Sequence, residues 1–276
     1  MILYNEYGIE FSLTNILLKV INMKFWIVSK RLLFVYSLVA LFITSIFYVN
    51  SNVVLTSSTT DRKIPIYSVN RTDNKVAITF DVAWDDNDVK DILSVLDKYK
   101  IKASFFIVGE WMDKYPESTE LIHNKGHEIV NHSDTHPYMT KLSQAEMERE
   151  ILDCDAKIYK VTGKKLGLFR PPYGDYNNDV VTVADSVDHK VIQWDVDSLD
   201  WQDLSAQEIC NRVTSKVKSG SIILLHVGAK NTPGALPLLL EKLNTDGYKP
   251  VKVSEIIYKN NYYIDHTGMQ IKNTEN

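Results

Sequence analysis

Short apolar runs and longer amphipathic stretches alternate along the chain from residue 75 onward. The short runs have the length and composition of strands, whereas the longer stretches repeat apolar residues at helical spacing, as Met147, Ile151 and Ile158 do. The expected strands are residues 76–80, 103–108, 128–130, 166–169, 191–194, 221–225 and a last strand ending at 253. The expected helices are residues 89–99, 117–124, 144–161, 206–217 and 236–244.

This regular alternation predicts an α/β fold in which parallel strands are joined by crossover helices. About seven strands over roughly 180 residues favour a TIM-like (β/α) barrel that is distorted or incomplete. A doubly wound open sheet is the alternative. No Gly-x-Gly-x-x-Gly follows the first strand, so the dinucleotide-binding version of that sheet is not favoured.

An uncharged apolar run occupies residues 32–49, before the alternating region. As a helix, its 18 residues would be about 27 Å long, close to the ~30 Å hydrocarbon core of a bilayer. Lys24, Lys30 and Arg31 precede the run, which predicts a cytoplasmic segment 1–31 and an extracytoplasmic remainder. We therefore predict a single-pass transmembrane signal-anchor in the cell membrane; a cleaved signal peptide is the alternative, although no A-x-A site ends the run.

Composition sets the other boundaries. Residues 1–22 have mixed character and Met23 would be a natural start for the anchor, so residues 1–22 are interpreted as an over-extended reading frame. Residues 50–74 are polar and contain a Ser/Thr cluster, which is typical of a linker. One domain is expected over residues 75–258, followed by a C-terminal tail at 259–276.

The charge balance argues against a nucleic-acid partner. The formal net charge is −4, without the basic footprint of a nucleic-acid binder. Cys154 and Cys210 form no Cys-x-x-Cys pair, so a cysteine zinc site is not expected, and two free thiols are favoured over a disulfide. We expect a monomer whose macromolecular contacts are the lipid bilayer and a substrate.

Residues suited to chemistry follow the expected strands. Carboxyl ends of barrel strands share one face, where active sites form, so these side chains are expected to converge. They are Asp81, then His132 and His136, then Arg170, Pro172 and Tyr173, then Asp195, Asp197, Asp200 and Trp201, and finally His226.

Each of these residues also has a simpler interpretation. Two histidines four residues apart can share a metal ion, but alone they are more often polar surface. Asp81 could cap the following helix, although Asp85 and Asp86 are better placed for that. Trp201 is of a type found more often in a core, and a lone His226 at the end of a buried strand is often structural. The convergence of all of them, rather than any single residue, indicates a metal-dependent site.

Taken together, these segments resemble the polysaccharide deacetylase superfamily, the family-four carbohydrate esterases that include chitin and peptidoglycan N-deacetylases. The resemblance covers residues 75–257, and the N-terminal anchor is similar to that of membrane-bound, sporulation-associated members. The family's motifs occur in order as Thr79-Phe80-Asp81, His132-Ser133-x-x-His136, Arg170-Pro171-Pro172-Tyr173-Gly174, Asp197-Ser198-Leu199-Asp200-Trp201 and Leu224-Leu225-His226.

The resemblance implies metal-dependent release of acetate from N-acetylated cell-wall glycan, either peptidoglycan or a chitin-like chain. His132 and His136 would hold a divalent metal ion, with zinc expected and cobalt or another divalent ion as alternatives. Asp81 would be the general base and Arg170 would keep it ionised. His226 would protonate the leaving amine, with Asp200 or Asp197 orienting it.

The resemblance also implies the substrate contacts. The backbone N–H of Tyr173 would stabilise the oxyanion, in the turn that Pro172 helps to fix. Trp201 and Leu224 would form the apolar wall around the acetyl methyl group.

The sequence departs from the family at one position. The usual first motif has a second aspartate that binds the metal, and here Val82 stands there. Three outcomes follow: Asp85 or Asp86 becomes the third ligand, Asp81 binds the metal directly, or the metal binds weakly and activity is lost. The alternative function is therefore a catalytically weak or inactive glycan-binding homologue. A glycosidase would need two carboxylates and would leave the histidine pair without a role.

Overall fold

The computed structural model describes residues 62–273, residues 3–4 and 10–11, and residues 34–36, 38–39, 41–42 and 44. The chain divides into two units, Met1–Asp61 and Arg62–Asn276. In the first unit, β1 (Leu3–Tyr4) pairs antiparallel with β2 (Glu10–Phe11). Most of the expected anchor at 32–49 lies outside the described residues. No helix within the described residues is long and apolar enough to cross a membrane.

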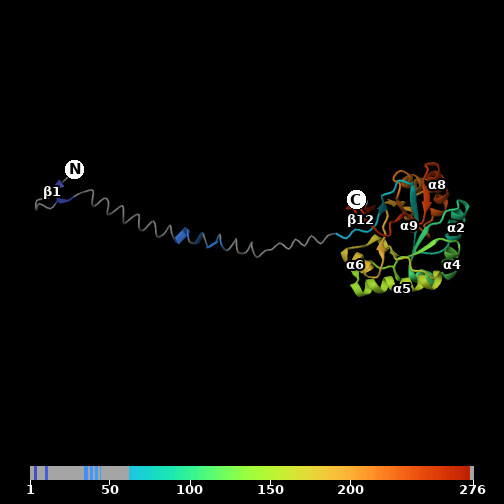
Figure 1. The fold of residues 1–276 in the computed structure, drawn as a ribbon, viewed down its shortest axis with the longest axis horizontal. Coiled ribbons are helices and arrows are strands. Elements are labelled where there is room, and N and C mark those ends of the chain that lie inside the picture. Colours follow the sequence, from blue (N-terminus) through green and yellow to red (C-terminus); the bar gives the residue numbers. More distant parts are fainter. Residues whose placement is uncertain are drawn as a thin grey trace. The chain divides into compact units, whose positions relative to one another are not determined.

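The second unit is built on a sheet of parallel strands (Figure 1). Its order is β8-β7-β6-β5-β4-β10-β9, and neighbouring strands all pair in parallel. The prediction of an incomplete barrel of about seven parallel strands is confirmed, although β9 was not among the expected strands. The bounds are β4 (Lys75–Val82), β5 (Ser104–Ile107), β6 (Glu128–Asn131), β7 (Leu168–Phe169), β8 (Lys190–Val191), β9 (Val196–Asp197) and β10 (Ile222–His226).

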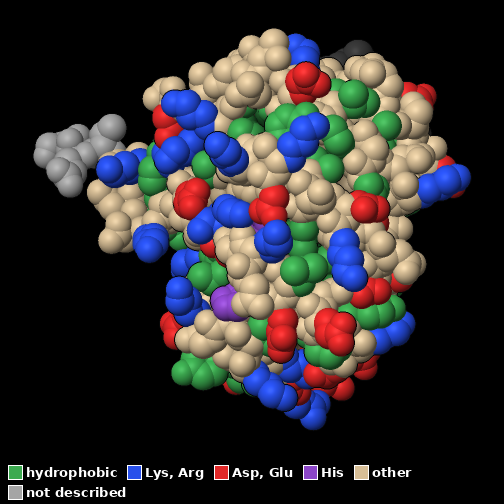
Figure 2. All heavy atoms as spheres, turned by 90° about the vertical axis from the view of Figure 1, so that its right-hand side faces the viewer, with side chains coloured by type: hydrophobic (Ala, Val, Ile, Leu, Met, Phe, Trp, Pro, Cys, Tyr) green, Lys and Arg blue, Asp and Glu red, His purple; other side chains and the backbone are tan. Residues whose placement is uncertain are grey.

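Helices cover the outer face of the sheet. The five predicted helices are present as α2 (Val89–Lys98), α4 (Pro116–Asn124), α5 (Gln144–Thr162), α7 (Ala206–Thr214) and α8 (Thr232–Thr245). The sequence interpretation missed α3 (Gly109–Lys114) and α6 (Asn178–Ser186), both short. Figure 2 shows the surface on the side of α2, α4 and α8, where basic and acidic side chains are interspersed among small apolar areas.

The central strand β4 shows how the chain separates the site from the core. Successive strand residues point to opposite faces of a sheet. Ile78, Phe80 and Val82 belong to the cluster between the sheet and its helices, and all three are fully buried. Thr79 and Asp81 alternate with them and therefore point into the barrel. Position 82 thus belongs to the helix-side core.

The domain is longer at both ends than the sequence predicted. Within the expected linker, Ile66 is buried and bridges Ile192, while β3 (Ser68–Val69) meets Gly220 and Ser221 just before β10. This segment therefore contacts the chain next to β8 and just before β10, and partly closes the barrel. Within the expected tail, β12 (Tyr262–Ile264) and β13 (Met269–Lys272) form a hairpin that pairs with β3.

The last predicted strand is shorter than expected. β11 (Lys249–Val251) pairs with the first residues of β4, on the edge where β5 has not yet begun. The chain then turns into α9 (Val253–Ile256), so residue 253 starts a helix rather than ending a strand.

Candidate active site

The carboxyl ends of the strands surround a cavity of about 420 Å³. Most of the predicted residues line it, so the expected convergence on one face is confirmed by the fold. The lining side chains are Asp81, Ala83, Trp84, His132, His136, Tyr173, Trp194, Asp197, Trp201, Leu224 and His226.

Arg170 and Asp81 form a buried ion pair on one wall of this cavity. Arg170 is fully buried, and its Nη1 donates to Asp81 Oδ1 at 2.6 Å. Other guanidinium bonds reach the Ile192 and Gln193 carbonyls and the Thr79 hydroxyl, so the fork is fixed on several sides. Burial alone would raise the pKa of Asp81, but the Arg170 charge outweighs it and keeps the pKa low. The carboxylate therefore remains ionised.

His132 is oriented by the backbone carbonyl of Arg170, the residue that follows β7. Its Nδ1 donates to the Arg170 carbonyl at 2.8 Å, which leaves Nε2 with a free lone pair. Nε2 lies 3.5 Å from Asp81 Oδ2. His136 follows four residues later in the same loop, and the two ring centroids are 5.1 Å apart. Burial lowers the pKa of His132 and lowers that of His136 to about 4, so both rings are neutral and can act as ligands.

The loop that carries these histidines is held in an uncommon conformation. Ser133 and His136 have φ values of 65° and 62°, in the left-handed region. The Asn131 side chain accepts from the Ser133 N–H, and Glu150 on α5 accepts from the N–H groups of residues 134 and 135. The neighbouring helix therefore fixes the positions of both histidines.

His226 and Asp200 form a second fixed pair, and His226 is the register partner of Asp81 on the neighbouring strand β10. His226 Nδ1 donates to Asp200 Oδ1 at 2.7 Å, and Asp200 Oδ2 accepts from the Thr232 hydroxyl at 2.6 Å. Burial alone would lower the pKa of His226, but the Asp200 hydrogen bond and charge raise it. Asp197 lines the cavity and accepts from the Leu199 N–H instead. Of the two alternatives, Asp200 is the residue that orients His226.

The predicted substrate contacts divide into two groups. Tyr173, Trp201 and Leu224 line the cavity, and Tyr173 lies in a turn with φ 60°. Pro172 is buried in that turn and does not line the cavity. In the structure Pro172 fixes the turn, and its predicted contact with substrate stays a prediction. Asp195 is likewise structural, because its carboxylate bonds Ser221 and the Ile222 N–H.

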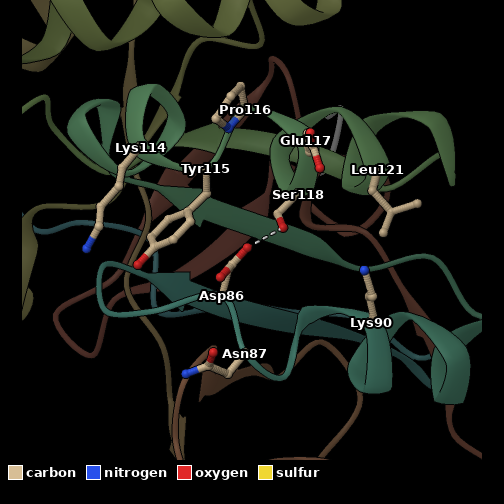
Figure 3. A pocket seen from close by; sticks show the side chains of 9 residues that line it. All are labelled: Asp86, Asn87, Lys90, Lys114, Tyr115, Pro116, Glu117, Ser118 and Leu121. Atoms are coloured by element: carbon tan, nitrogen blue, oxygen red, sulfur yellow. Dashed lines mark hydrogen bonds between the residues drawn. The ribbon is translucent and has the colours of Figure 1, made fainter.

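The predicted third metal ligand is not where the sequence placed it. Asp86 accepts from the Ser118 hydroxyl at 2.6 Å and faces a separate surface pocket (Figure 3). Asp85 accepts from the Asn87 N–H and is outside the cavity lining. Val82 points away into the core. The structure therefore does not bring Asp85 or Asp86 to the two histidines, and their assignment as ligands stays a prediction. In the described part of the chain, no three His, Cys, Asp or Glu side chains are arranged to hold a metal ion.

The two histidines nevertheless fit the imidazole part of a metal site. Both rings are neutral, face one cavity and have a fixed supporting loop, which are features of metal-binding histidines. His132 Nε2 is directed toward Asp81, the carboxylate that the structure brings next to the pair. The site thus presents two imidazoles suited to a metal ion, whereas a catalytic zinc ion usually has three protein ligands.

Sequence reasoning missed two aromatic residues at the mouth. Trp84 is 48% exposed and stacks on His226 with ring centroids 5.3 Å apart. Tyr138 stacks on Tyr173 at 4.2 Å. Both residues follow a strand end by a few positions, and large exposed aromatic side chains in such loops are the signal that could have found them.

Comparisons with known proteins agree with this geometry. The family model described as polysaccharide deacetylase matches residues 68–192. A peptidoglycan-N-acetylglucosamine deacetylase of Bacillus cereus is 35% identical over 66% of this chain and 87% of its own length. The chain belongs to the polysaccharide deacetylase family.

Other relatives differ in length and in activity. The chain matches 60% of the uncharacterized protein YlxY and 38% of the peptidoglycan-N-acetylmuramic acid deacetylase PdaC, both of Bacillus subtilis, so it spans less than two thirds of either. The solved structure of BA3943 from Bacillus anthracis, described as a pseudoenzyme of family CE4, has a TM-score of 0.67 and 33% identity, covering 70% of this chain and 68% of that one. The family thus includes enzymes and at least one protein described as inactive.

Proposed function

We propose that this protein is a membrane-anchored deacetylase that removes N-acetyl groups from peptidoglycan or a chitin-like glycan outside the cytoplasm. The observation that carries the proposal is the pair of side-chain couples, Arg170–Asp81 and Asp200–His226, at the ends of the neighbouring strands β4 and β10, beside one cavity that the two histidines also line. Hydrolysis of an amide requires a base for water and an acid for the leaving amine, and these couples suit the two roles.

In the first couple, Asp81 receives the proton of the attacking water. Arg170 keeps the carboxylate ionised and in one orientation, so no reorganisation is needed before proton transfer. A divalent metal ion held by His132 and His136, such as zinc or cobalt, would supply Lewis acidity and lower the pKa of water.

In the second couple, His226 delivers a proton to the leaving nitrogen from Nε2. Asp200 holds the proton on Nδ1 and favours the imidazolium form, so the ring is charged before the carbon–nitrogen bond breaks. The backbone N–H of Tyr173 would support the oxyanion, and Leu224 and Trp201 would surround the acetyl methyl group.

The substrate class is supported by the names of the relatives and by the predicted anchor. The Bacillus cereus and Bacillus subtilis relatives are named as peptidoglycan deacetylases. A signal-anchor at residues 32–49 would hold the domain beside wall glycan.

The test combines metal content with acetate release. The full chain, purified in detergent, is analysed by elemental mass spectrometry and incubated with N-acetylglucosamine oligomers and peptidoglycan. Zinc near one equivalent that is lost in His132→Ala, but kept in the exposed control His266→Ala, together with released acetate, supports the enzyme. Absence of acetate with zinc and with cobalt added contradicts it.

A second candidate is a glycan-binding protein without effective catalysis. It is favoured by one observation, the burial of Val82 in the helix-side core with no replacement ligand among the described residues. Wild-type protein that sediments with peptidoglycan, holds no zinc and releases no acetate would support this candidate over the first.

A further inference from the structure

Trp84 is an aromatic side chain at the mouth that no sequence motif explains. It lies in the loop between β4 and α2, three residues after Asp81. The indole lines the cavity while 48% of its surface is exposed.

The indole lies flat against the imidazole of His226. The ring centroids are 5.3 Å apart and the planes differ by 14°, an offset parallel stack. Asp200 fixes the Nδ1 edge of the same imidazole at 2.7 Å. One edge and one face of His226 are therefore held by the protein, and Nε2 is the nitrogen left for the cavity.

The backbone around Trp84 is built to keep this stack. Gly228, two residues after His226, has φ 87°, and a Cβ there would lie 3.3 Å from Trp84 Cβ. The Gly228 N–H donates to Asp88 Oδ1 at 2.9 Å, which ties the loop after β10 to the loop after β4. A side chain at position 228 would press on Trp84, so the glycine allows the close approach of the two loops.

We propose that Trp84 is a positioning residue that holds His226 in one orientation and stabilises its protonated form through the stacked indole. The inference rests on the proposed role of His226 as proton donor. An aromatic face attracts a cation, and an imidazolium stacked on indole gains this attraction while the neutral ring does not.

Other charged groups also affect the protonation of His226, so their effects must be distinguished from the effect of Trp84. Asp200 after β9, Asp197 on β9 and Asp81 on β4 favour the imidazolium. His132 and His136 lie within electrostatic reach on the β6 side. All of these residues remain when only Trp84 is changed, so substitution at 84 isolates the stack.

The experiment is an NMR titration of the His226 imidazole in the full chain, with kcat and KM measured in parallel. The variants are Trp84→Phe, which keeps an aromatic face, and Trp84→Leu, which keeps apolar bulk without one. Tyr138→Leu is the matched control, because Tyr138 is an equally exposed aromatic that stacks on Tyr173 instead.

We expect Trp84→Leu to lower the His226 pKa by about half a unit and to lower kcat roughly 10-fold with little change in KM. Trp84→Phe should recover most of both effects, and Tyr138→Leu should leave the His226 titration unchanged. An unchanged His226 titration in Trp84→Leu, or an equal shift in Tyr138→Leu, would overturn the proposal. The titration needs no turnover, so absence of acetate release from every variant would contradict the proposed function and not the role of Trp84.

Discussion

The two walls of the cavity differ in how completely they are built. On the wall formed by β4 and β10, each ionisable group has a fixed partner, Arg170 for Asp81 and Asp200 for His226. On the wall formed by the loop after β6, His132 and His136 are well oriented, yet the described residues supply no third ligand beside them. The side proposed to transfer protons is complete, and the side proposed to hold a metal ion is not.

This difference follows from the direction of single side chains. Position 82 directs its side chain to the helices because strand residues alternate, and Val82 packs there at no exposure. The proton-transfer residues lie on inward positions, where buried polar groups need partners and have them. The family chemistry can therefore be kept in one half of a site while the other half changes.

The largest effect is expected from breaking the buried ion pair. Arg170→Gln leaves Asp81 buried without its counter-ion, and we expect a loss of about 3–5 kcal/mol of stability together with loss of acetate release. Denaturant unfolding measures the first effect. Lys190→Gln, which breaks the exposed pair with Asp185, is the control and should change stability by less than about 1 kcal/mol. Equal losses in the two variants would show that the buried pair has no special role.

Val82→Asp tests whether the missing ligand can be restored by one substitution. The new carboxylate would be buried among the apolar residues of the helix-side core, and we expect destabilisation of about 3 kcal/mol at neutral pH. Burial raises the pKa of such a carboxyl group, so the loss should shrink as the pH falls and the group protonates. Thermal unfolding with and without zinc measures this. A larger zinc-induced rise in Tm than in wild type would instead show that the carboxylate has reached the histidines.

Asp200→Asn tests the second couple of the complete wall. The amide keeps the shape but loses the charge that supports the imidazolium, so kcat should fall roughly 100-fold while KM changes little. Asp197→Asn is the matched control, because Asp197 lines the cavity without bonding His226, and a small loss is expected there. A larger loss in Asp197→Asn would reverse the assignment of the two carboxylates.

The smallest effect is a shift in the pH profile. The pKa of His226 is raised, and its protonated form is the proposed donor, so kcat should fall as the pH rises through that pKa. Removing the charge of Asp200 lowers the pKa of His226, so the alkaline limb of Asp200→Asn should move to lower pH, by about one unit. The profile is measured with saturating substrate, and a limb that stays in place would assign it to another group.

The sequence predicted the framework because periodicity reports local structure. Strand and helix patterns located seven strands and five helices, and residues at the strand ends converge because parallel strands share one carboxyl face. Pairing of segment 66–69 with the chain next to β8 and before β10 was not predictable, since polar composition made this segment look like a linker. The same holds for the β12–β13 hairpin, whose partner β3 is distant in sequence.

The sequence by itself determined which chemical groups gather around the cavity. They are Asp81, the two histidines, Arg170, Asp200 and His226. The sequence also determined that Val82 points outward, because side chains along a strand such as β4 alternate between the two faces and this alternation depends only on position along the strand. Only the tertiary structure decided that His226 pairs with Asp200 rather than with Asp197. The same is true of the hydrogen bond from Ser118 to Asp86 and of the stack of Trp84 on His226. Those contacts join loops from different strands, and the distance between such loops is set by packing of the whole barrel rather than by spacing along the chain.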